Sequence, residues 1–346
     1  MNTPLRIGVL GLTHDHVWGN AADVANCPHT ELVAAADPHG PLMEQFQEKF
    51  DRPVYPAYEA LLEEETLDAV YLFADNAAGA DLAEMAAGRG LSILVEKPMA
   101  HSLEGADRML AAARRAGVRL MVNWPFAWLP QLQHALTMAA RGDIGDVWEV
   151  KYRAAHCGPE NLGCSSYFCE WLFDAERNRA GALMDYCCYG AVLARAVLGV
   201  PARVTGVAAR VQKEHITLED NGVLVMTYPR GLAISEASWT QVGDLTNYVT
   251  TIYGSQGTLV VEPRHDGRLL LATGESPKGV EVEVPPLTPE MQNSAAHFAH
   301  ALSSGEPFNV LCQARVGRDA QEILEAGLIS AQEGMEVSLP LKNWSQ

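Results

Sequence analysis

Residues 7–19 read IGVLGLTHDHVWG, an apolar strand pattern that runs into a glycine turn and then into a helical pattern. The same alternation continues to about residue 122. The strand candidates are RIGVL, ELVAAAD, LDAVYLF, LSILVE and VRLMVN, and the helix candidates between them include DHVWGNAADVAN, AGADLAEMAAGRG and SLEGADRMLAAARRAG. Alternating strands and amphipathic helices predict a parallel, doubly wound sheet of the Rossmann type.

The pattern changes after Asn123, so we expect a dinucleotide-binding domain over residues 1–123 and a second domain over residues 124–346. A helix, QLQHALTMAARGD, leads into DVWEVKYRAAH. Between about residues 203 and 284 the strand candidates follow one another without helices: RVTGVAARVQ, NGVLVMTYP, GLAISEASWT, YVTTIYG, GTLVVEP, RLLLAT and VEVEVP. This succession predicts an α+β domain with a large, mostly antiparallel open sheet, closed by two C-terminal helices.

The composition argues against several classes of partner. The charged residues give 25 − 43 = −18, and no cluster of basic residues accompanies an aromatic ladder, so we expect no nucleic-acid partner. The sequence has no secretory leader pattern and no uninterrupted apolar run of about 18 residues, which predicts a cytoplasmic protein without a membrane partner. Seven cysteines without regular spacing fit a reducing compartment.

The turn after the first strand predicts a dinucleotide site. With the first fingerprint glycine at Gly11, Thr13 and His16 stand where two further glycines are usual. Asp37, at the end of the second strand, would accept hydrogen bonds from an adenosine ribose and so favours NAD over NADP. The alternative is a plain strand-turn-helix unit that binds no nucleotide.

Two clusters raise the question of a metal. His14, Asp15 and His16 lie in the turn, but two histidines without a located third ligand do not make a site, and such residues often cap helices. The cysteines at 157, 164 and 169 lack a paired CxxC spacing. We therefore predict no metal.

The stretch VEKPM, residues 95–99, follows the fifth strand and resembles the Glu-Lys-Pro motif of the Gfo/Idh/MocA family of NAD(P)-dependent oxidoreductases. LVAAADPH, ARGDIGDVWEV, YGSQGTLVVE, AGALMDYCCYGAVLARAVLG and EILEAGLISAQEGMEVSLP resemble further segments of that family. The resemblance implies an enzyme that acts on CH–OH groups of sugars, inositols or related polyols, and that assembles as a homodimer or homotetramer. It also implies a cofactor site formed by Gly11, Thr13, His14, Asp37, Asn76, Glu96 and Lys97.

The stretch MDYCCYG, residues 184–190, places two adjacent cysteines between Asp185 and Tyr189. In a helix over residues 183–198, Asp185 and Tyr189 are four residues apart and so lie about 40° apart on one face. Cys187 then points away, and a disulfide between neighbouring helical residues would be strained. We expect reduced, packed thiols.

The family resemblance implies a catalytic group of Lys97, Asp185 and Tyr189, with Tyr189 where most members carry a histidine. We expect Tyr189 to act as the general acid/base in a hydride transfer. An unperturbed phenol titrates near pH 10, so Lys97 would have to lower its pKa, while Asp185 orients the lysine or the substrate. The alternative for Tyr189 is a buried core phenol bonded to a carbonyl.

The substrate-binding candidates are aromatic and polar residues of the second domain. Trp124 and Trp171, and also Trp128 and Tyr167, could stack on a sugar ring, while His156 and Arg153 supply polar contacts. The competing function is a non-catalytic dinucleotide sensor or regulator on the same fold. The missing fingerprint glycines favour the sensor, and the Glu-Lys-Pro motif with Asp185 and Tyr189 favours the enzyme.

Overall fold

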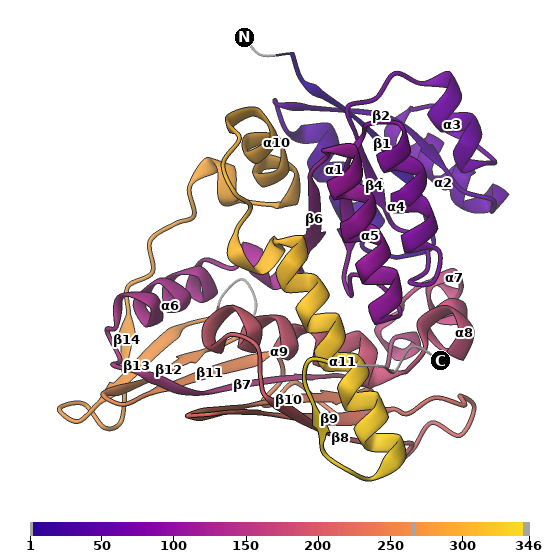
Figure 1. Cartoon of the computed structure of the whole chain (residues 1–346). Helices are drawn as coiled ribbons and strands as arrows, with labels where there is room; N and C mark the ends of the chain where they lie inside the picture. Colours follow the sequence, from indigo (N-terminus) through magenta and orange to yellow (C-terminus); the bar gives the residue numbers. More distant parts are fainter. Residues whose placement is uncertain (1–2, 264–266, 342–346) are drawn as a thin grey trace.

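The computed structural model describes residues 3–263 and 267–341. Figure 1 shows an N-terminal α/β unit at the top and a broad sheet at the bottom, with helices between them.

The N-terminal sheet has six parallel strands in the order β3-β2-β1-β4-β5-β6. The strands are β1 (Leu5–Leu10), β2 (Thr30–Ala36), β3 (Val54–Tyr55), β4 (Ala69–Leu72), β5 (Ser92–Glu96) and β6 (Leu120–Asn123). The helices that connect them are α1 (Val17–Asn26), α2 (Gly40–Phe50), α3 (Tyr58–Glu64), α4 (Gly79–Gly88) and α5 (Leu103–Ala116). This order confirms the predicted doubly wound sheet, whose ligands bind at the carboxyl ends of the strands. The sequence analysis missed β3 because two residues show no alternation.

The second sheet has nine strands in the order β14-β13-β12-β11-β7-β10-β9-β8-β15. They are β7 (Val147–Ala155), β8 (Arg203–Ala209), β9 (Asn221–Tyr228), β10 (Gly231–Ser238), β11 (Val249–Gly254), β12 (Gly257–Val261), β13 (Leu269–Thr273), β14 (Val280–Val282) and β15 (Val337–Ser338). The pairing of β7 with β10 is parallel and the other pairings are antiparallel. The prediction of a large, mostly antiparallel sheet is therefore confirmed.

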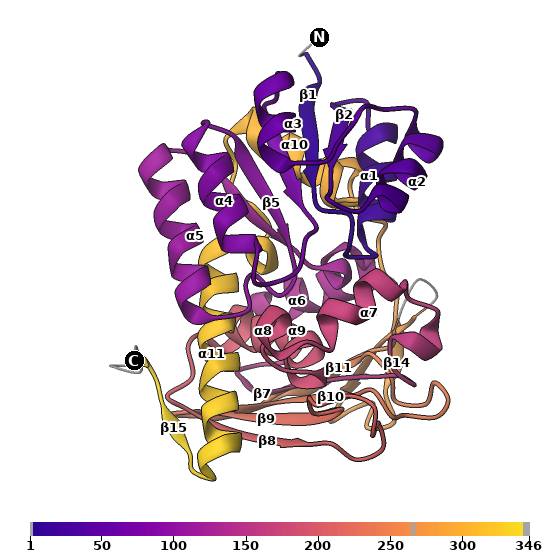
Figure 2. The same cartoon turned by 90° about the vertical axis from the view of Figure 1, so that its right-hand side faces the viewer.

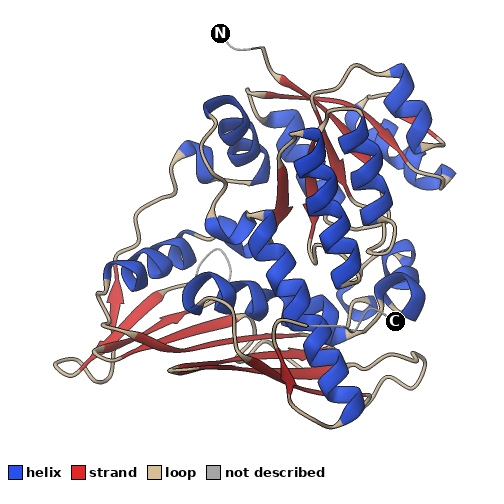
Figure 3. Ribbon diagram, viewed as in Figure 1, coloured by secondary structure: helices blue, strands red, loops and turns tan. Residues whose placement is uncertain are grey.

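Helices cover one face of this sheet, while its other face carries no helix of the described chain (Figure 3). The covering helices are α6 (Pro130–Arg141), α9 (Ala182–Leu198) and α11 (Ala314–Glu333). Helix α9 lies so close to β10 that a Cβ atom at Gly190 would stand only 2.1 Å from Ser235 Oγ. This close packing holds the predicted helix over residues 183–198 between the two sheets.

The C-terminal part of the chain returns to the N-terminal unit. Helix α10 (Ser294–Ser304) packs against α1, and α11 packs against both α5 and α9. The parallel sheet ends at Asn123 and the second sheet begins at Val147. The domain boundary after Asn123 stays a prediction.

One stretch, Ala175–Leu198, is long and apolar enough to cross a membrane by composition. However, 72% of its most apolar 18-residue window is buried inside the protein. The stretch contains α9, and burial of this helix in the protein core accounts for its apolar character.

Candidate active site

A buried ion pair joins the two units of the fold. Lys97 directly follows β5, at the carboxyl edge of the parallel sheet, and Asp185 lies in the first turn of α9. Lys97 Nζ donates to Asp185 Oδ1 at 2.6 Å, and both side chains are less than a tenth exposed. Trp239 Nε1 donates to the other carboxylate oxygen, Oδ2, at 3.2 Å. The predicted contact between these two residues is thus present.

Lys97 carries its charge in this site. Burial alone would lower the pKa of Lys97, but the negative charge of Asp185 and its hydrogen bond outweigh burial, so the pKa lies above the ordinary lysine value. The ammonium lies 5.3 Å from the ring centre of Tyr189 and 5.5 Å from that of Tyr186. Both distances are in the range of cation–π contacts.

Tyr189 shares the Asp185 face of α9, as the helical period predicts, and is 6% exposed. However, the pKa of this phenol is raised, and not lowered as we expected from the neighbouring Lys97 ammonium. Burial raises the pKa of Tyr189 well above the ordinary phenol value, and surrounding groups that include Cys188 and Tyr152 raise it further. The Lys97 ammonium is bound to Asp185 rather than to the phenol oxygen. Tyr189 therefore stays protonated near neutral pH.

A cavity of about 390 Å³ opens beside this group. Its lining residues are His16, Pro125, Phe126, Leu129, Leu132, Tyr152, Tyr186, Tyr189, Tyr248, Thr250, Val261 and Glu262. Tyr186 and Tyr189 stack with ring centres 5.9 Å apart, and the Tyr186 and Tyr248 hydroxyls lie 3.0 Å from each other. The cavity therefore offers aromatic surfaces with hydroxyl groups at their rims.

The three predicted substrate-binding residues do not line this cavity. Trp124 is 1% exposed and packs edge-on against Tyr189. His156 packs edge-on against Tyr186, with ring centres 4.9 Å apart. Trp171 donates from Nε1 to the carbonyl oxygen of Thr13 at 3.4 Å, which places it at the dinucleotide turn. The size and aromatic character of a residue do not tell whether its side chain lines the cavity or packs behind the residues that line it.

The additional candidates lie elsewhere as well. Trp128 donates to the side chain of Asn123, and Arg153 pairs with Glu236. The ring of Tyr167 stands 5.1 Å from that of His39.

Tyr186 and Tyr248 are pocket residues that the sequence analysis missed. The helical period could have identified Tyr186, because it lies three residues before Tyr189 and so on a neighbouring part of the same face. Tyr248 reaches the cavity from the segment between β10 and β11, where it adopts a left-handed backbone with φ of 53°. No local pattern signals that contact.

Glu96, at the end of β5, contacts His16, which lines the cavity. His16 Nδ1 lies 2.9 Å from Glu96 Oε1, and Asn123 Nδ2 donates to Glu96 Oε2 at 2.8 Å. Glu96 is 4% exposed, so these two partners compensate for the loss of water around its carboxylate.

The dinucleotide turn keeps the fingerprint geometry at its first glycine. Gly11 has φ of 90°, and a Cβ atom there would stand 2.3 Å from the main-chain nitrogen of Ala74. Thr13 Oγ1 is buried without a hydrogen-bond partner among the described residues. The close approach of Ala74 thus requires glycine at position 11, and the orphaned Thr13 hydroxyl fits an oxygen of a dinucleotide diphosphate.

Asp37 does not present its carboxylate to a ribose in this structure. It is fully buried. The main-chain N–H of Leu12 donates to Oδ2 at 2.6 Å, while the main-chain N–H and Nδ1 of His39 contact Oδ1 at 2.8 and 2.7 Å. The ribose contact predicted for Asp37 would require the His39 ring to move aside.

The structure brings a third possible ligand to the two histidines of the turn. His14, His16 and Glu96 each offer one ligand atom, and these atoms lie within 4.8 Å of one another. Yet the main-chain N–H of His16 donates to His14 Nδ1 at 3.2 Å, and His16 Nδ1 contacts Glu96. His14, His16 and Glu96 thus form a polar cluster between the dinucleotide turn and the end of β5.

The paired cysteines are reduced and packed, as predicted. All seven thiols are free, and Cys187 and Cys188 are buried. Cys187 Sγ faces the β10 backbone, 3.4 Å from the carbonyl oxygen of Ser235, and Cys188 Sγ lies 3.0 Å from that of Asp185. Burial raises the pKa of Cys187 and Cys188, which keeps both thiols protonated and poorly nucleophilic.

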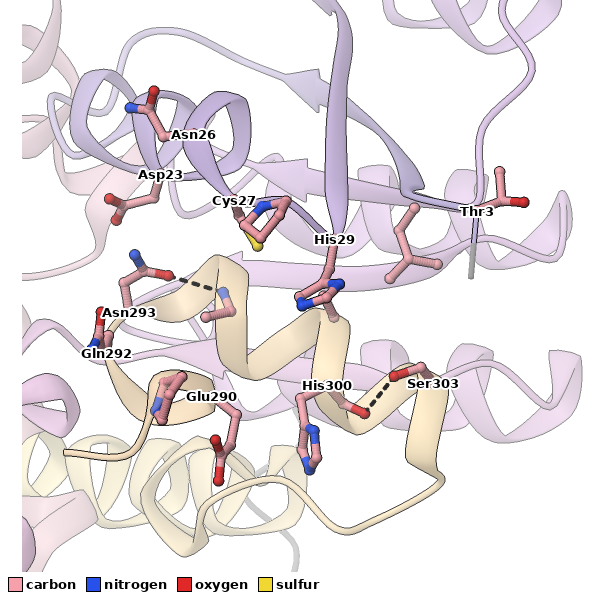
Figure 4. Close-up of a pocket in the computed structure, with 15 residues that line it drawn as sticks. Thr3, Asp23, Asn26, Cys27, His29, Glu290, Gln292, Asn293, His300 and Ser303 are labelled. Atoms are coloured by element: carbon pink, nitrogen blue, oxygen red, sulfur yellow. Dashed lines mark hydrogen bonds between the residues drawn. The ribbon is translucent and has the colours of Figure 1, made fainter. Parts of the chain in front are cut away.

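A larger cavity of about 840 Å³ lies apart from this site, between the end of α1 and helix α10 (Figure 4). Asp23, His29, Glu290 and His300 contribute polar groups to it. In Figure 4 the side chains of Glu290 and His300 point away from Asp23, so its charged groups do not converge.

Acid is expected to destabilise the protein through His156. Burial is the main cause that lowers the pKa of His156 to about 4, against the opposing charge of Asp185, and its Nδ1 accepts from the Gly158 N–H at 2.8 Å. An unfolded histidine titrates near 6.5. Between these values the unfolded chain binds more protons, so the free energy of unfolding should fall by up to about 3 kcal/mol as the pH falls from about 6.5 to 4.

Urea unfolding of the protein and of His156→Gln at several pH values measures this effect. Below pH 6.5, the unfolding free energy of the variant should fall less steeply with decreasing pH than that of the wild type, because the contribution of His156 is lost. Equal slopes for the two proteins would show that His156 does not contribute.

Both units of the chain are similar to known proteins. Residues 5–124 match the family model described as "Oxidoreductase family, NAD-binding Rossmann fold", and residues 132–260 match that of the "GFO/IDH/MocA C-terminal domain". A dTDP-3,4-didehydro-2,6-dideoxy-alpha-D-glucose 3-reductase from Actinomadura kijaniata is 29% identical over 65% of this chain and 65% of its own length. An enzyme with the same description from Streptomyces violaceoruber is 28% identical over 90% of this chain and 93% of its own length.

Two further proteins are similar over different spans. A D-xylose 1-dehydrogenase (NADP(+)) from Haloferax volcanii is 31% identical over 49% of this chain and 50% of its own length. An oxidoreductase from Agrobacterium radiobacter, solved in complex with NAD+, L-tartaric acid and magnesium, superposes with a TM-score of 0.82. It is 21% identical and covers 97% of this chain and 98% of its own, which shows a shared fold.

Proposed function

The chain belongs to the Gfo/Idh/MocA family of oxidoreductases, and we propose that it is an NAD(P)-dependent dehydrogenase or reductase. It moves a hydride between the nicotinamide and a hydroxyl-bearing carbon of a sugar, inositol or related polyol. The observation that carries this proposal is the buried Lys97–Asp185 pair, set against Tyr189 at the wall of a cavity.

The cofactor residues are proposed from their place at the carboxyl edge of the parallel sheet. Glu96 ends β5 and Lys97 follows it, while Gly11, Thr13 and His14 lie in the turn after β1 and Asn76 lies in the loop after β4. When bound there, the nicotinamide supplies or accepts the hydride. Asp37 at the end of β2 favours NAD, with NADP the less favoured cofactor, provided that His39 moves aside.

Tyr189 is the proposed proton donor. Its raised pKa keeps the phenol protonated near neutral pH, so in the reductive direction it donates its proton to a carbonyl oxygen as that oxygen becomes a hydroxyl. The Lys97 ammonium, 5.3 Å from the ring centre, stabilises the phenolate that remains until water returns the proton. Asp185 holds the ammonium in place and so acts as a positioning residue.

The cavity supports a small polyhydroxylated substrate. Its volume of about 390 Å³ lies within the range of small-molecule sites, about 300–1,000 Å³. The aromatic rings of its wall suit the apolar faces of a sugar, and tyrosine hydroxyls suit the polar edge. The relatives described above are named for sugar substrates, which agrees with this class.

We also propose that the open face of the second sheet pairs two or more copies into a homodimer or homotetramer. Val207 and Trp148 expose 61% and 43% of their surface on this part of the molecule, and apolar surface of this kind favours association. A monomeric mass in sedimentation would contradict this. The reduced thiols fit a cytoplasmic location, which cell fractionation would test.

A non-catalytic dinucleotide sensor is the second candidate, favoured by the replaced fingerprint glycines Thr13 and His16. Fluorescence titration with NADH and NADPH, followed by a panel of sugars and keto sugars monitored at the reduced-cofactor absorbance, separates the two. The enzyme should bind the dinucleotide and consume it with at least one sugar. Binding without turnover across the panel would support the sensor, and absence of binding would exclude both.

A further inference from the structure

We propose that residues 165–178, which we call the cover segment, form a lid that closes over the dinucleotide turn and must swing away before a dinucleotide binds. The segment comprises α7 (Ser166–Leu172) and α8 (Ala175–Asn178) with their caps. It comes from the second unit of the fold, yet lies below the N-terminal sheet in both views (Figures 1 and 2). This inference rests on the proposed dinucleotide binding.

The start of the cover segment is bound to the turn itself. Ser165 donates from its main-chain N–H to Asp15 Oδ2 at 2.7 Å and from Oγ to Asp15 Oδ1 at 2.6 Å. The His14 ring packs against Phe168 and Trp171, with ring centres 4.8 and 5.6 Å apart. These contacts cover the backbone that would face a diphosphate.

The end of the cover segment is bound to the loop after β4. Arg177 Nε donates to Asp75 Oδ2 at 2.9 Å, and the carbonyl oxygen of Arg177 accepts from the Ala77 N–H at 3.0 Å. Asn76 Nδ2 donates to Asn178 Oδ1 at 2.7 Å. The segment thus spans the carboxyl edge of the sheet, where a doubly wound fold binds its ligand.

Under this lid the turn is closed. Thr13 and His14 are 5% and 1% exposed. Two main-chain donors of the turn are satisfied within the protein: the Leu12 N–H donates to Asp37, and the His14 N–H donates to the carbonyl oxygen of Phe73 at 3.0 Å. Because Thr13 Oγ1 remains buried without a partner among the described residues, the closed state leaves one polar group that a ligand oxygen would satisfy.

The segment has a candidate hinge on each side. Gly163 has φ of 81° and open space around its missing Cβ, and Arg179 has φ of 74°. Residues with positive φ lie at positions where the chain reverses direction. When a lid moves, a few residues at such positions absorb the change in backbone angles. Arg179 Nη2 donates to Glu325 Oε1 on α11 at 2.5 Å, which anchors the hinge end to the body of the protein.

Variants on the cover segment test the lid without altering the turn. Ser165→Ala removes the side-chain bond to Asp15 together with the N-cap bond from the Phe168 N–H, and Arg177→Met removes the bond to Asp75. Each lost bond should raise the open fraction about 5-fold, and therefore tighten NADH binding by about the same factor while the closed state still predominates. Arg108→Met is the matched control, because it breaks the exposed contacts of Arg108 on α5 with Asp81 and Glu84 on α4, away from the lid.

NADH fluorescence titration and hydrogen exchange of residues 165–178 provide the readouts. The lid predicts that the double variant Ser165→Ala/Arg177→Met binds NADH more than 10-fold tighter than the wild type and exchanges faster in this segment, with Arg108→Met unchanged. Equal NADH affinity in the wild type, the two single variants, the double variant and Arg108→Met would overturn the lid and leave the proposed function intact. If neither the wild type nor the double variant binds NADH or NADPH, the dinucleotide function itself fails and the lid with it.

Discussion

Lys97→Met is expected to lower turnover about 1,000-fold, because it removes the cation that stabilises the phenolate of Tyr189. The same change leaves the Asp185 carboxylate buried without its ion-pair partner. Removing one member of a buried pair costs about 3–5 kcal/mol of unfolding free energy. Steady-state kinetics with the substrate found in the sugar panel and urea unfolding measure the two effects separately.

Two further variants separate chemistry from folding. Lys97→Met/Asp185→Asn removes the uncompensated charge, so it should regain much of the stability without regaining turnover. Arg195→Met breaks another pair on α9, in which Arg195 Nε contacts Asp319 Oδ2 at 2.8 Å. It should destabilise the protein but preserve turnover per folded molecule. A folded Lys97→Met that keeps a tenth or more of the wild-type turnover would contradict the role assigned to Lys97.

Tyr189→Phe is expected to lower turnover about 100-fold while changing the unfolding free energy by less than about 1 kcal/mol, because the ring stays and only the proton donor is lost. Tyr228→Phe is its control. That phenol is also buried, but its hydroxyl has no hydrogen-bond partner among the described residues, and it lies outside the cavity. Tyr228→Phe should keep full turnover.

The pH profile gives a second readout for Tyr189. Because burial raises the pKa of this phenol above its ordinary value, the reductive rate of the wild type should be flat from about pH 6 to 9. Tyr189→His should recover part of the lost turnover and acquire a pH dependence near 6 to 7, where imidazole titrates. A flat profile in Tyr189→His with wild-type turnover would show that this position does not donate the proton.

The fold was largely predictable because its signals are local. Alternating strands and helices up to Asn123 imply the parallel sheet, and the helical period alone places Asp185 and Tyr189 on one face. The contact between Lys97 and Asp185 spans 88 positions. It was expected from the resemblance of VEKPM and MDYCCYG to a known family, not from spacing.

The remaining features depend on tertiary contacts that leave no periodic trace. The Asp37 carboxylate contacts the ring and the main-chain N–H of His39, two residues further along the chain. This contact depends on the path of the backbone after β2. Trp171 is of a residue type that can stack on a sugar ring, yet its position on α7 places it against Thr13. The net shift of the Tyr189 pKa was predicted in the wrong direction, because burial raises this pKa by more than a cation already paired with Asp185 can lower it.

The most direct test of the proposed function is isotope transfer from reduced dinucleotide deuterated at C4 of the nicotinamide to a sugar substrate. The account predicts that wild-type protein forms a product with one deuterium on the carbon that becomes the alcohol, and that Lys97→Met forms almost none. Product that carries no deuterium from either face of the labelled nicotinamide, or equal transfer by wild type and Lys97→Met, would contradict it.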